Sequence, residues 1–227
     1  MDAPALTRRE RLRRDTLAEI RERALAQIAE GGPSAVSLNA IAKAMGMSGP
    51  AVYRYFASRD ELLAVLVAEG YAELVAALET AEAAAGRRRP AGRLDAVADA
   101  YRAWASAHPH RYAMLFGVRP AGVTDTEAAI STVHAGMRVL LRVLGELVVD
   151  PAAAPPVAPR LDAQLSRWAA RHGDGDVPPP VLLLGVQTWT RLHGIVSLEL
   201  AGVFADMDVD PALLLRAELA QIVAAAR

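Results

Sequence analysis

Residues that can contact a nucleic acid gather in one short stretch of the chain, residues 48–59. Tyr53 and Tyr55 carry hydroxyl groups that can reach phosphate oxygens, and Arg54 between them can neutralise a phosphate or hydrogen-bond guanine. The residues before them, Gly49-Pro50-Ala51, are small, so the backbone can approach base edges closely. Ser48 and the free amides beside it can donate to phosphate. These residue types in this order predict a surface that binds duplex DNA.

A packing role competes with DNA contact for the aromatic residues of this stretch. Three of the eleven aromatic residues of the chain are Tyr53, Tyr55 and Phe56. We expect Phe56 in the core of a small domain and Tyr53 on the surface, whereas Tyr55 fits either place. Lys43, the only lysine, either meets a phosphate or lies in solvent.

Two short helices that meet at a tight turn would position these groups. Ser37 is a good N-cap for a helix that ends near Met45, and Gly46 suits the left-handed residue after it. Ser48 can cap a second helix that runs to about Phe56. The apolar residues that can face one small core are Leu38, Ile41, Ala42, Met47 and Val52. Residues 37–56 therefore predict a helix-turn-helix, in which the first helix supports a second that enters the major groove.

The rest of the chain has the pattern of helices joined by polar or proline-rich loops. Alanine (48 residues) and leucine (28) favour helix, and β-forming residues are sparse. Ser58 and Glu61 form a capping-box pattern ahead of a helix that continues to residue 85. We expect further helices over residues 7–30, 93–107, 110–116, 124–148, 160–171, 181–204 and 211–226, with loops at 86–90, 150–159 and 172–180. The predicted fold class is all-α.

Several kinds of chemistry are missing from the sequence. Without cysteine there are no disulfides and no thiolate metal ligands, and the five histidines show only one weak ligand spacing. Phosphate-binding glycine loops and the nucleophile elbow of hydrolases are absent too. The net charge is only −1, but residues 1–14 hold five arginines against two acidic residues. Neither a signal segment nor a membrane-spanning run is present, so we expect a cytoplasmic protein. From the missing motifs we expect no cofactor and no metal.

The stretch from Val36 to Leu63 resembles the TetR family of bacterial transcriptional regulators. The shared features are the capped helix with Ile-Ala, the glycine turn, the Tyr-x-Tyr-Phe run and the closing Glu-Leu-Leu. The resemblance implies a three-helix DNA-binding domain joined by a fourth helix to a ligand-binding domain. Residues expected to contact DNA are Ser37, Lys43, Ser48, Gly49, Pro50, Ala51, Tyr53, Arg54, Tyr55 and Arg59. Gly49-Pro50 replaces a more usual pair that contains Lys, which implies readout there by backbone and van der Waals contacts.

The C-terminal part resembles the TetR subgroup whose effector domain carries a Trp/His-Gly signature. Here that signature is Trp189 with His193-Gly194. Trp189 and His193 are four residues apart, so they share one helix face. Residues expected near a ligand pocket are Tyr101, Trp104, Tyr112, Met137, Trp189 and His193. The alternative is that His193 is a satisfied core residue and that Gly185 and Gly194 mark close helix packing.

These patterns predict a helix-turn-helix domain over residues 1–57 and a helical effector-binding and dimerisation domain over 58–227, with the 58–85 helix as connector. We expect a homodimer that binds a palindromic double-stranded DNA operator, with the 181–204 helix packed at its interface beside 124–148 or 210–226. A small apolar or amphipathic ligand would release the DNA. Because the ligand would release the protein from its operator, we expect a repressor. We do not expect an enzyme. The other reading is a helical-bundle carrier or enzyme without DNA binding, which would place large apolar residues at 48–59.

Overall fold

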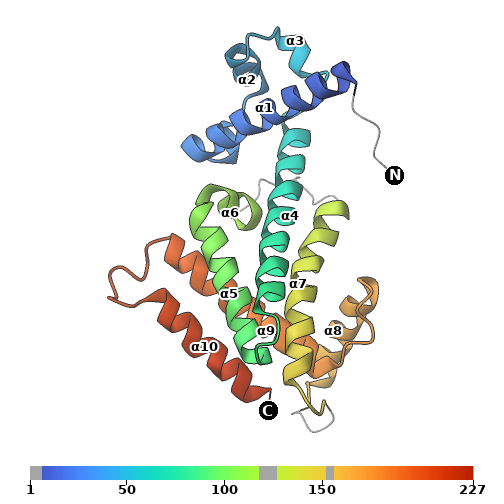
Figure 1. Ribbon diagram of the computed structural model, residues 1–227, viewed down its shortest axis with the longest axis vertical. Helices are drawn as coiled ribbons and strands as arrows, with labels where there is room; N and C mark the ends of the chain where they lie inside the picture. Colours follow the sequence, from blue (N-terminus) through green and yellow to red (C-terminus); the bar gives the residue numbers. More distant parts are fainter. Residues whose placement is uncertain (1–6, 118–126, 152–155, 227) are drawn as a thin grey trace. The chain divides into compact units, whose positions relative to one another are not determined.

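The computed structural model describes residues 7–117, 127–151 and 156–226, and this part of the chain is built from helices with no strand (Figure 1). The predicted all-α class is therefore confirmed. In chain order the elements are α1 (Arg8–Gly31), the 3-10 turn η1 (Pro33–Ala35), α2 (Leu38–Ala44), α3 (Gly49–Val52), α4 (Arg59–Ala85), α5 (Pro90–Ala107), α6 (Pro109–Phe116), α7 (Glu127–Leu147), α8 (Pro159–Arg171), α9 (Pro179–Leu200) and α10 (Pro211–Ala225).

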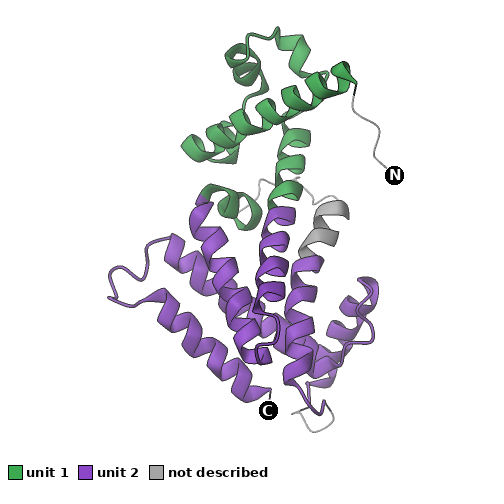
Figure 2. Cartoon of the chain, in the orientation of Figure 1, with its two compact units in different colours: residues 1–70, 110–126 green, residues 71–109, 127–227 purple. Residues whose placement is uncertain are grey.

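The chain divides into two compact units (Figure 2). The first comprises residues 1–70 and 110–126 and holds α1 to α3, the first part of α4 and nearly all of α6. The second comprises residues 71–109 and 127–227 and holds the rest of α4 with α5 and α7 to α10. The helix α4 thus contributes residues to both units. A functional boundary at residue 57 stays a prediction.

The core of the first unit is built around α1. Ile20, Ala24 and Ile28 recur every four residues on this helix and are buried, and α1 contacts α2. From the helix-turn-helix, the predicted core residues Leu38, Ile41, Ala42 and Val52 are all buried, whereas Met47 is only partly covered. Helix α6 packs on α4 at Gly70, where a Cβ would lie 3.2 Å from the Leu115 side chain.

In the second unit α9 is the central helix, in contact with α5, α7, α8 and α10. Gly185 permits the close approach of α7, because a Cβ there would lie 2.6 Å from Leu141 Cδ2. Close packing at Gly185 is thus confirmed. A Cβ at Gly194, by contrast, would meet no atom of the described chain within 4 Å.

A buried ion-pair network joins three helices of the second unit. Glu82 of α4 is only 9% exposed. Its carboxylate accepts from Arg93 of α5 and, at 2.9 Å, from Arg142 of α7. Arg93 also pairs with Glu146 of α7 at 2.6 Å. These pairs fix the register of α4 against α5 and α7.

Several helix ends differ from the sequence expectation. The second helix of the helix-turn-helix ends at Val52 and not near Phe56, and residues 53–55 continue as hydrogen-bonded turns. Helix α9 ends at Leu200, and residues 201–208 form turns in which Gly202 adopts φ +75°. Half of the predicted capping box forms: Ser58 Oγ accepts from the Glu61 amide, but the Glu61 carboxylate accepts from Ala57. Residues 124–126 and 152–155 of the expected helix and loop lie outside the described residues.

Candidate nucleic-acid interface

The turn of the helix-turn-helix is fixed by local hydrogen bonds. Ser37 caps α2 by accepting from the Ala40 amide at 3.3 Å, and its own amide donates to Gln27 of α1 at 2.9 Å. Gly46 adopts φ +66°, a left-handed conformation that costs a glycine little. The Met47 amide then bonds back to the Ala42 carbonyl at 2.9 Å. The chain therefore reverses between α2 and α3 in a hydrogen-bonded turn.

The residues predicted to meet DNA lie on or next to α3 and are largely exposed. Tyr53 is 45% exposed and Arg54 is exposed beside it. Ser48 has the extended backbone of an N-cap, yet its side chain makes no capping bond. Gly49 and Ala51 are partly covered, and Pro50 is exposed. The surface thus offers two hydroxyl groups and one guanidinium around small residues, a combination suited to phosphate and base edges.

Tyr55 and Phe56, next in sequence, have different surroundings. Phe56 is 3% exposed, which confirms its predicted place in the core. Tyr55 is half-buried, and the Arg13 guanidinium carbon of α1 lies 5.6 Å from the centre of its ring. That distance is within the range of a cation–π contact. Tyr55 is therefore held by α1 and still reaches the surface.

Two of the basic residues predicted to contact DNA differ in the contacts that they already make within the protein. Lys43 is exposed in the last turn of α2, where a cation is also favoured by the helix dipole. The Arg59 guanidinium, by contrast, donates to the Pro33 carbonyl at 2.6 Å and to Asp60 at 3.3 Å. Arg59 thus ties η1 to the start of α4. It would have to leave these partners to contact a phosphate.

Three of the residues predicted near a ligand pocket are brought together in the second unit. The Tyr101 hydroxyl of α5 lies 3.2 Å from His193 Nδ1 of α9, and the Tyr101 ring meets Trp189 edge-on at 5.5 Å. The Trp189 and His193 rings are stacked, 6.0 Å apart. Burial lowers the pKa of His193, which favours a neutral imidazole beside the Tyr101 hydroxyl. This arrangement matches the alternative reading of His193 as a satisfied residue of the bundle.

The other three pocket candidates have separate surroundings. Trp104 is 8% exposed and contacts the His108 ring, and its indole N–H has no acceptor in the described part of the chain. Met137 of α7 lies beside Gly185. Tyr112 is buried in the first unit, with its ring 4.8 Å from that of Phe116. Tyr112 thus belongs to a different unit from the other five candidates.

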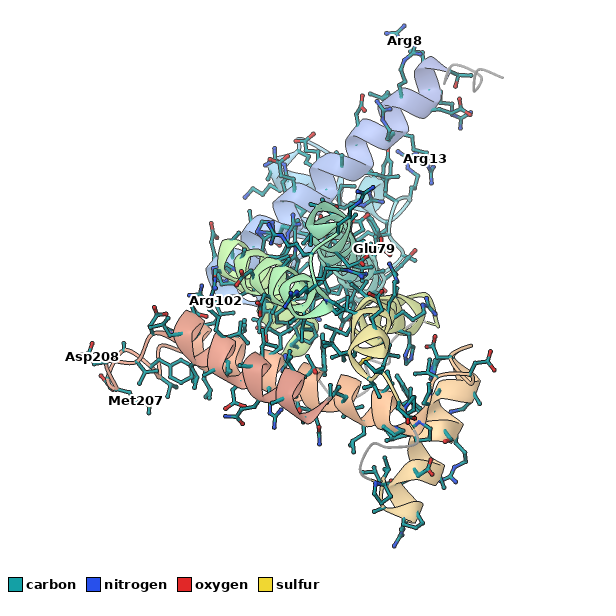
Figure 3. All side chains as sticks on the ribbon, turned by 60° about the horizontal axis from the view of Figure 1, so that its bottom comes forward. Arg8, Arg13, Glu79, Arg102, Met207 and Asp208 are labelled. Atoms are coloured by element: carbon teal, nitrogen blue, oxygen red, sulfur yellow. The ribbon has the colours of Figure 1, made fainter. Side chains whose placement is uncertain are left out.

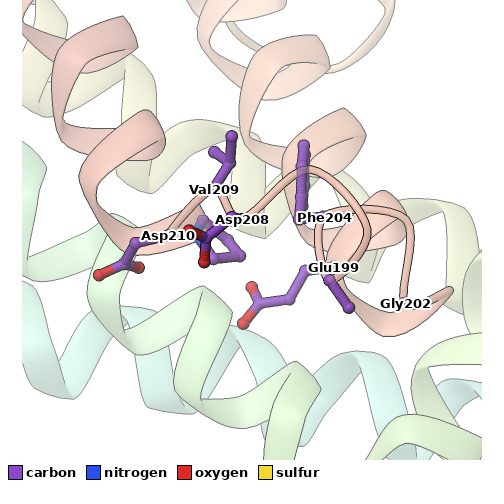
Figure 4. Close-up of a pocket in the computed structure, with 8 residues that line it drawn as sticks. Glu199, Gly202, Phe204, Asp208, Val209 and Asp210 are labelled. Carbon is purple, nitrogen blue, oxygen red and sulfur yellow. The ribbon is translucent and has the colours of Figure 1, made fainter.

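Described residues of the second unit line two cavities, and none of the six candidates is among these residues. One, of about 460 Å³, lies at the turn between α9 and α10, where Glu199, Asp208 and Asp210 surround it (Figure 4). The other, of about 320 Å³, lies between α4, α7 and the turn after α8, and it is lined by Glu79, Arg138 and Asp174 among others. Among the described residues no group of three acidic or histidine side chains could hold a metal ion.

Several structural residues were not foreseen from the sequence. Gln27 connects α1 to the start of α2, and the ion pairs of Glu82 and of Arg102 with Glu199 connect helices of the second unit. The partners in the last pair are 97 residues apart, so no spacing rule could have linked them. None of the helices in the described ranges is long and apolar enough to cross a membrane.

An exposed helix-turn-helix on a small three-helix core, together with an all-helical second unit, defines a DNA-binding regulator. The family described as bacterial regulatory proteins of the tetR family matches residues 20–66, and the tetracyclin repressor-like C-terminal domain matches residues 94–222. The chain belongs to the TetR family of transcriptional regulators. Membership of the Trp/His-Gly subgroup stays a prediction.

Relatives of similar length support this assignment. The HTH-type transcriptional regulator Rv1816 of Mycobacterium tuberculosis is 31% identical over 215 residues, which are 91% of this chain and 90% of that protein. The crystal structure of protein SCO4313 has 39% identity and a TM-score of 0.79, and the match covers 96% of this chain and all of the other. The TetR family regulator PfmR from Thermus thermophilus, at 19% identity and a TM-score of 0.57 over 90% of this chain and 97% of its own, shares the fold.

Proposed function

We propose that this regulator is a repressor that acts in the cytoplasm, binding a palindromic operator as a homodimer. The exposed pair Tyr53 and Arg54 carries the proposal. Neither side chain has a hydrogen bond or an ion pair within the described residues, and neither packs in the core. An exposed tyrosine and arginine beside a helix of small residues have no structural purpose here, but they match phosphate and guanine.

The remaining DNA contacts are assigned by their position around this pair. The Ser48 hydroxyl has no capping bond to break, and Gly49, Pro50 and Ala51 leave room for base edges. Ser37 and Lys43 are exposed on α2 and would meet the phosphate backbone. Tyr55 would contribute its hydroxyl from beneath Arg13. Arg59, which already has two partners, would make the weakest contact.

A homodimer is supported by apolar side chains exposed around the end of α9. Leu198, Val203, Met207 and Leu213 are all exposed within sixteen residues. Single exposed apolar residues are ordinary, but a cluster on adjoining elements is typical of an interface. The open face at Gly194 would let a partner helix approach closely. A two-fold dimer through α9 and α10 would present two recognition helices to the two halves of a palindrome.

A small effector would bind in the second unit. The buried Trp104 N–H has no acceptor among the described residues, and Tyr101 and Trp189 form a separate aromatic pair. These groups favour a small apolar or amphipathic ligand with one hydrogen-bond acceptor. To release DNA, the ligand must bind the conformation of low DNA affinity more tightly. A coupling of roughly 1–3 kcal/mol is usual for such systems.

Fluorescence anisotropy tests the proposal. The probe is the duplex immediately upstream of the gene of this protein, and a scrambled duplex of the same composition is the control. We expect tight, salt-sensitive binding to the first and weaker binding to the second, with a specificity ratio of at least about 10³. Equal and weak binding to both duplexes would contradict a repressor acting at its own promoter.

A further inference from the structure

The N-terminal turns of α1 carry a dense group of positive charges. Arg8, Arg9, Arg11, Arg13 and Arg14 all lie within the first seven residues of the helix, and all are exposed. Cations are disfavoured at a helix N-terminus, because the macrodipole is positive there. The capping box between Thr7 and Glu10 offsets this in part. Such a concentration of arginine is therefore not explained by the stability of α1.

Two of these arginines share the face of α1 that packs on the helix-turn-helix. The buried face is set by Ile20, Ala24 and Ile28. At 100° per residue, Arg13 and Arg9 each lie within about 20° of the direction of Ile20. Arg8 and Arg11 lie more than about 100° away. In Figure 3, Arg8 and Arg13 accordingly leave α1 on different sides.

A direct contact connects this face to the proposed DNA-binding surface. The Arg13 guanidinium lies over the ring of Tyr55, 5.6 Å from its centre. Tyr55 follows Tyr53 and Arg54 in the turn after α3. Neither Arg9 nor Arg13 has an ion-pair partner among the described residues, whereas Arg14 pairs with Asp15 at 3.1 Å. Two uncompensated charges thus extend the surface beyond α3 along α1.

We infer that Arg9 and Arg13 form a second DNA contact, with the phosphate backbone next to the segment that α3 reads. The contact is independent of sequence, because an arginine on a phosphate carries no information about the base. Stacking on Tyr55 holds the Arg13 side chain extended before DNA arrives, and it orients the Tyr55 hydroxyl at the same time. This inference rests on the proposed function, since it assumes that the turn after α3 contacts DNA.

A matched pair of double variants tests the inference. Arg9→Gln with Arg13→Gln removes two charges from the face beside Tyr55. Arg8→Gln with Arg11→Gln removes two charges from the same turns on the other side and leaves Thr7 and Glu10 in place. Circular dichroism and thermal melting of both variants check that α1 and the first unit remain folded. The binding constants are then measured by anisotropy on the upstream and scrambled duplexes from 50 to 300 mM salt.

For the Arg9/Arg13 variant we expect the slope of log K against log salt to fall by about 1.8, because each phosphate contact contributes about 0.9. The loss should be the same on both duplexes, so the specificity ratio should not change. The Arg8/Arg11 variant should change the slope by less than half as much. Equal slopes for the two variants, or a wild-type slope in the Arg9/Arg13 variant, would overturn the inference.

The two proposals fail in different ways. If wild-type protein does not distinguish the two duplexes, sequence-specific regulation at this promoter is wrong, yet the salt slope on the scrambled duplex still reports on Arg9 and Arg13. If the wild type does distinguish them and the Arg9/Arg13 variant binds equally well, only the second contact is wrong.

Discussion

In the first unit the side chains proposed to meet DNA are exposed and have few partners, whereas several polar side chains inside the second unit are paired with one another. Tyr53 and Arg54 follow α3, and their side chains make no hydrogen bond or ion pair within the described residues. In the second unit, Tyr101 bonds His193, and Glu82 joins Arg93 to Arg142. An unpaired exposed group is available to a ligand, but a paired buried group mostly maintains the fold.

This difference separates function from stability. Replacing an unpaired group in the first unit should remove binding and leave the fold intact. Replacing a paired group in the second unit should destabilise the fold first, and any effect on DNA binding would follow from that.

Glu82→Ala should lower the free energy of unfolding by about 3 kcal/mol, because it leaves the buried Arg93 without its main partner. Arg93 keeps Glu146, and Arg142 is 53% exposed, so the cost should stay near the lower end of the usual range. Urea unfolding followed by circular dichroism measures the change. DNA affinity at low temperature, where the variant is folded, should be unaltered.

The matched control is Glu79→Ala, one turn earlier on the same helix, where the side chain is exposed. This variant should change the free energy of unfolding by no more than about 0.5 kcal/mol. Similar losses in the two variants would mean that the Glu82 network contributes nothing beyond the general charge of α4.

Tyr53→Ala and Arg54→Ala should each weaken operator binding by about 1–3 kcal/mol, and the double variant should abolish detectable binding. The melting temperature and the oligomeric state should stay nearly unchanged, because both side chains are exposed. Anisotropy and sedimentation measure the two properties. Arg87→Ala removes an equally exposed arginine from the linker after α4 and should bind as the wild type does. Loss of the dimer in a Tyr53 or Arg54 variant would contradict the assigned role.

The two units also differ in how much of their functional detail the sequence could predict. The helix-turn-helix is encoded within twenty residues by caps, a glycine turn and apolar spacing. The sequence therefore predicts both helices and the exposed Tyr53 and Arg54, although α3 ends before the predicted Phe56. The contact between Arg13 and Tyr55 is between residues 42 positions apart and follows no spacing rule. In the second unit the helices were foreseen from periodicity, but the bond between Tyr101 and His193 spans 92 positions. Such distant pairs decide whether a predicted pocket residue already has a hydrogen-bond partner within the protein or is available to a ligand.

Two glycines of α9 test the proposed dimer face. Gly185→Ala should destabilise each subunit by roughly 1 kcal/mol, because the strain against Leu141 exceeds the gain in helix propensity. Gly194→Ala should stabilise an isolated subunit by about 0.5–1 kcal/mol, since its Cβ would meet open space. If α9 packs at a dimer interface, however, the same methyl group should weaken the dimer. Urea unfolding and sedimentation over a dilution series measure both quantities, and an unaltered dimer constant for Gly194→Ala would exclude Gly194 from the interface.

The smallest expected effect concerns the proton equilibrium of His193. Because burial lowers its pKa in the folded protein, the unfolded chain takes up a proton at a pH where the folded chain does not. The free energy of unfolding should therefore fall as the pH decreases from 7.5 to 5.0 through the ordinary pKa of histidine, and it should recover as the pH rises.

Burial also lowers the pKa of His134, which acts in the same direction, so the two histidines must be separated by single variants. In His193→Gln the dependence on pH should be shallower than in the wild type, as measured by urea unfolding at each pH. An equally steep dependence in His193→Gln would mean that His193 is as accessible to protons as a surface residue. The second unit would then hold an open polar site at His193, and not a histidine satisfied by Tyr101.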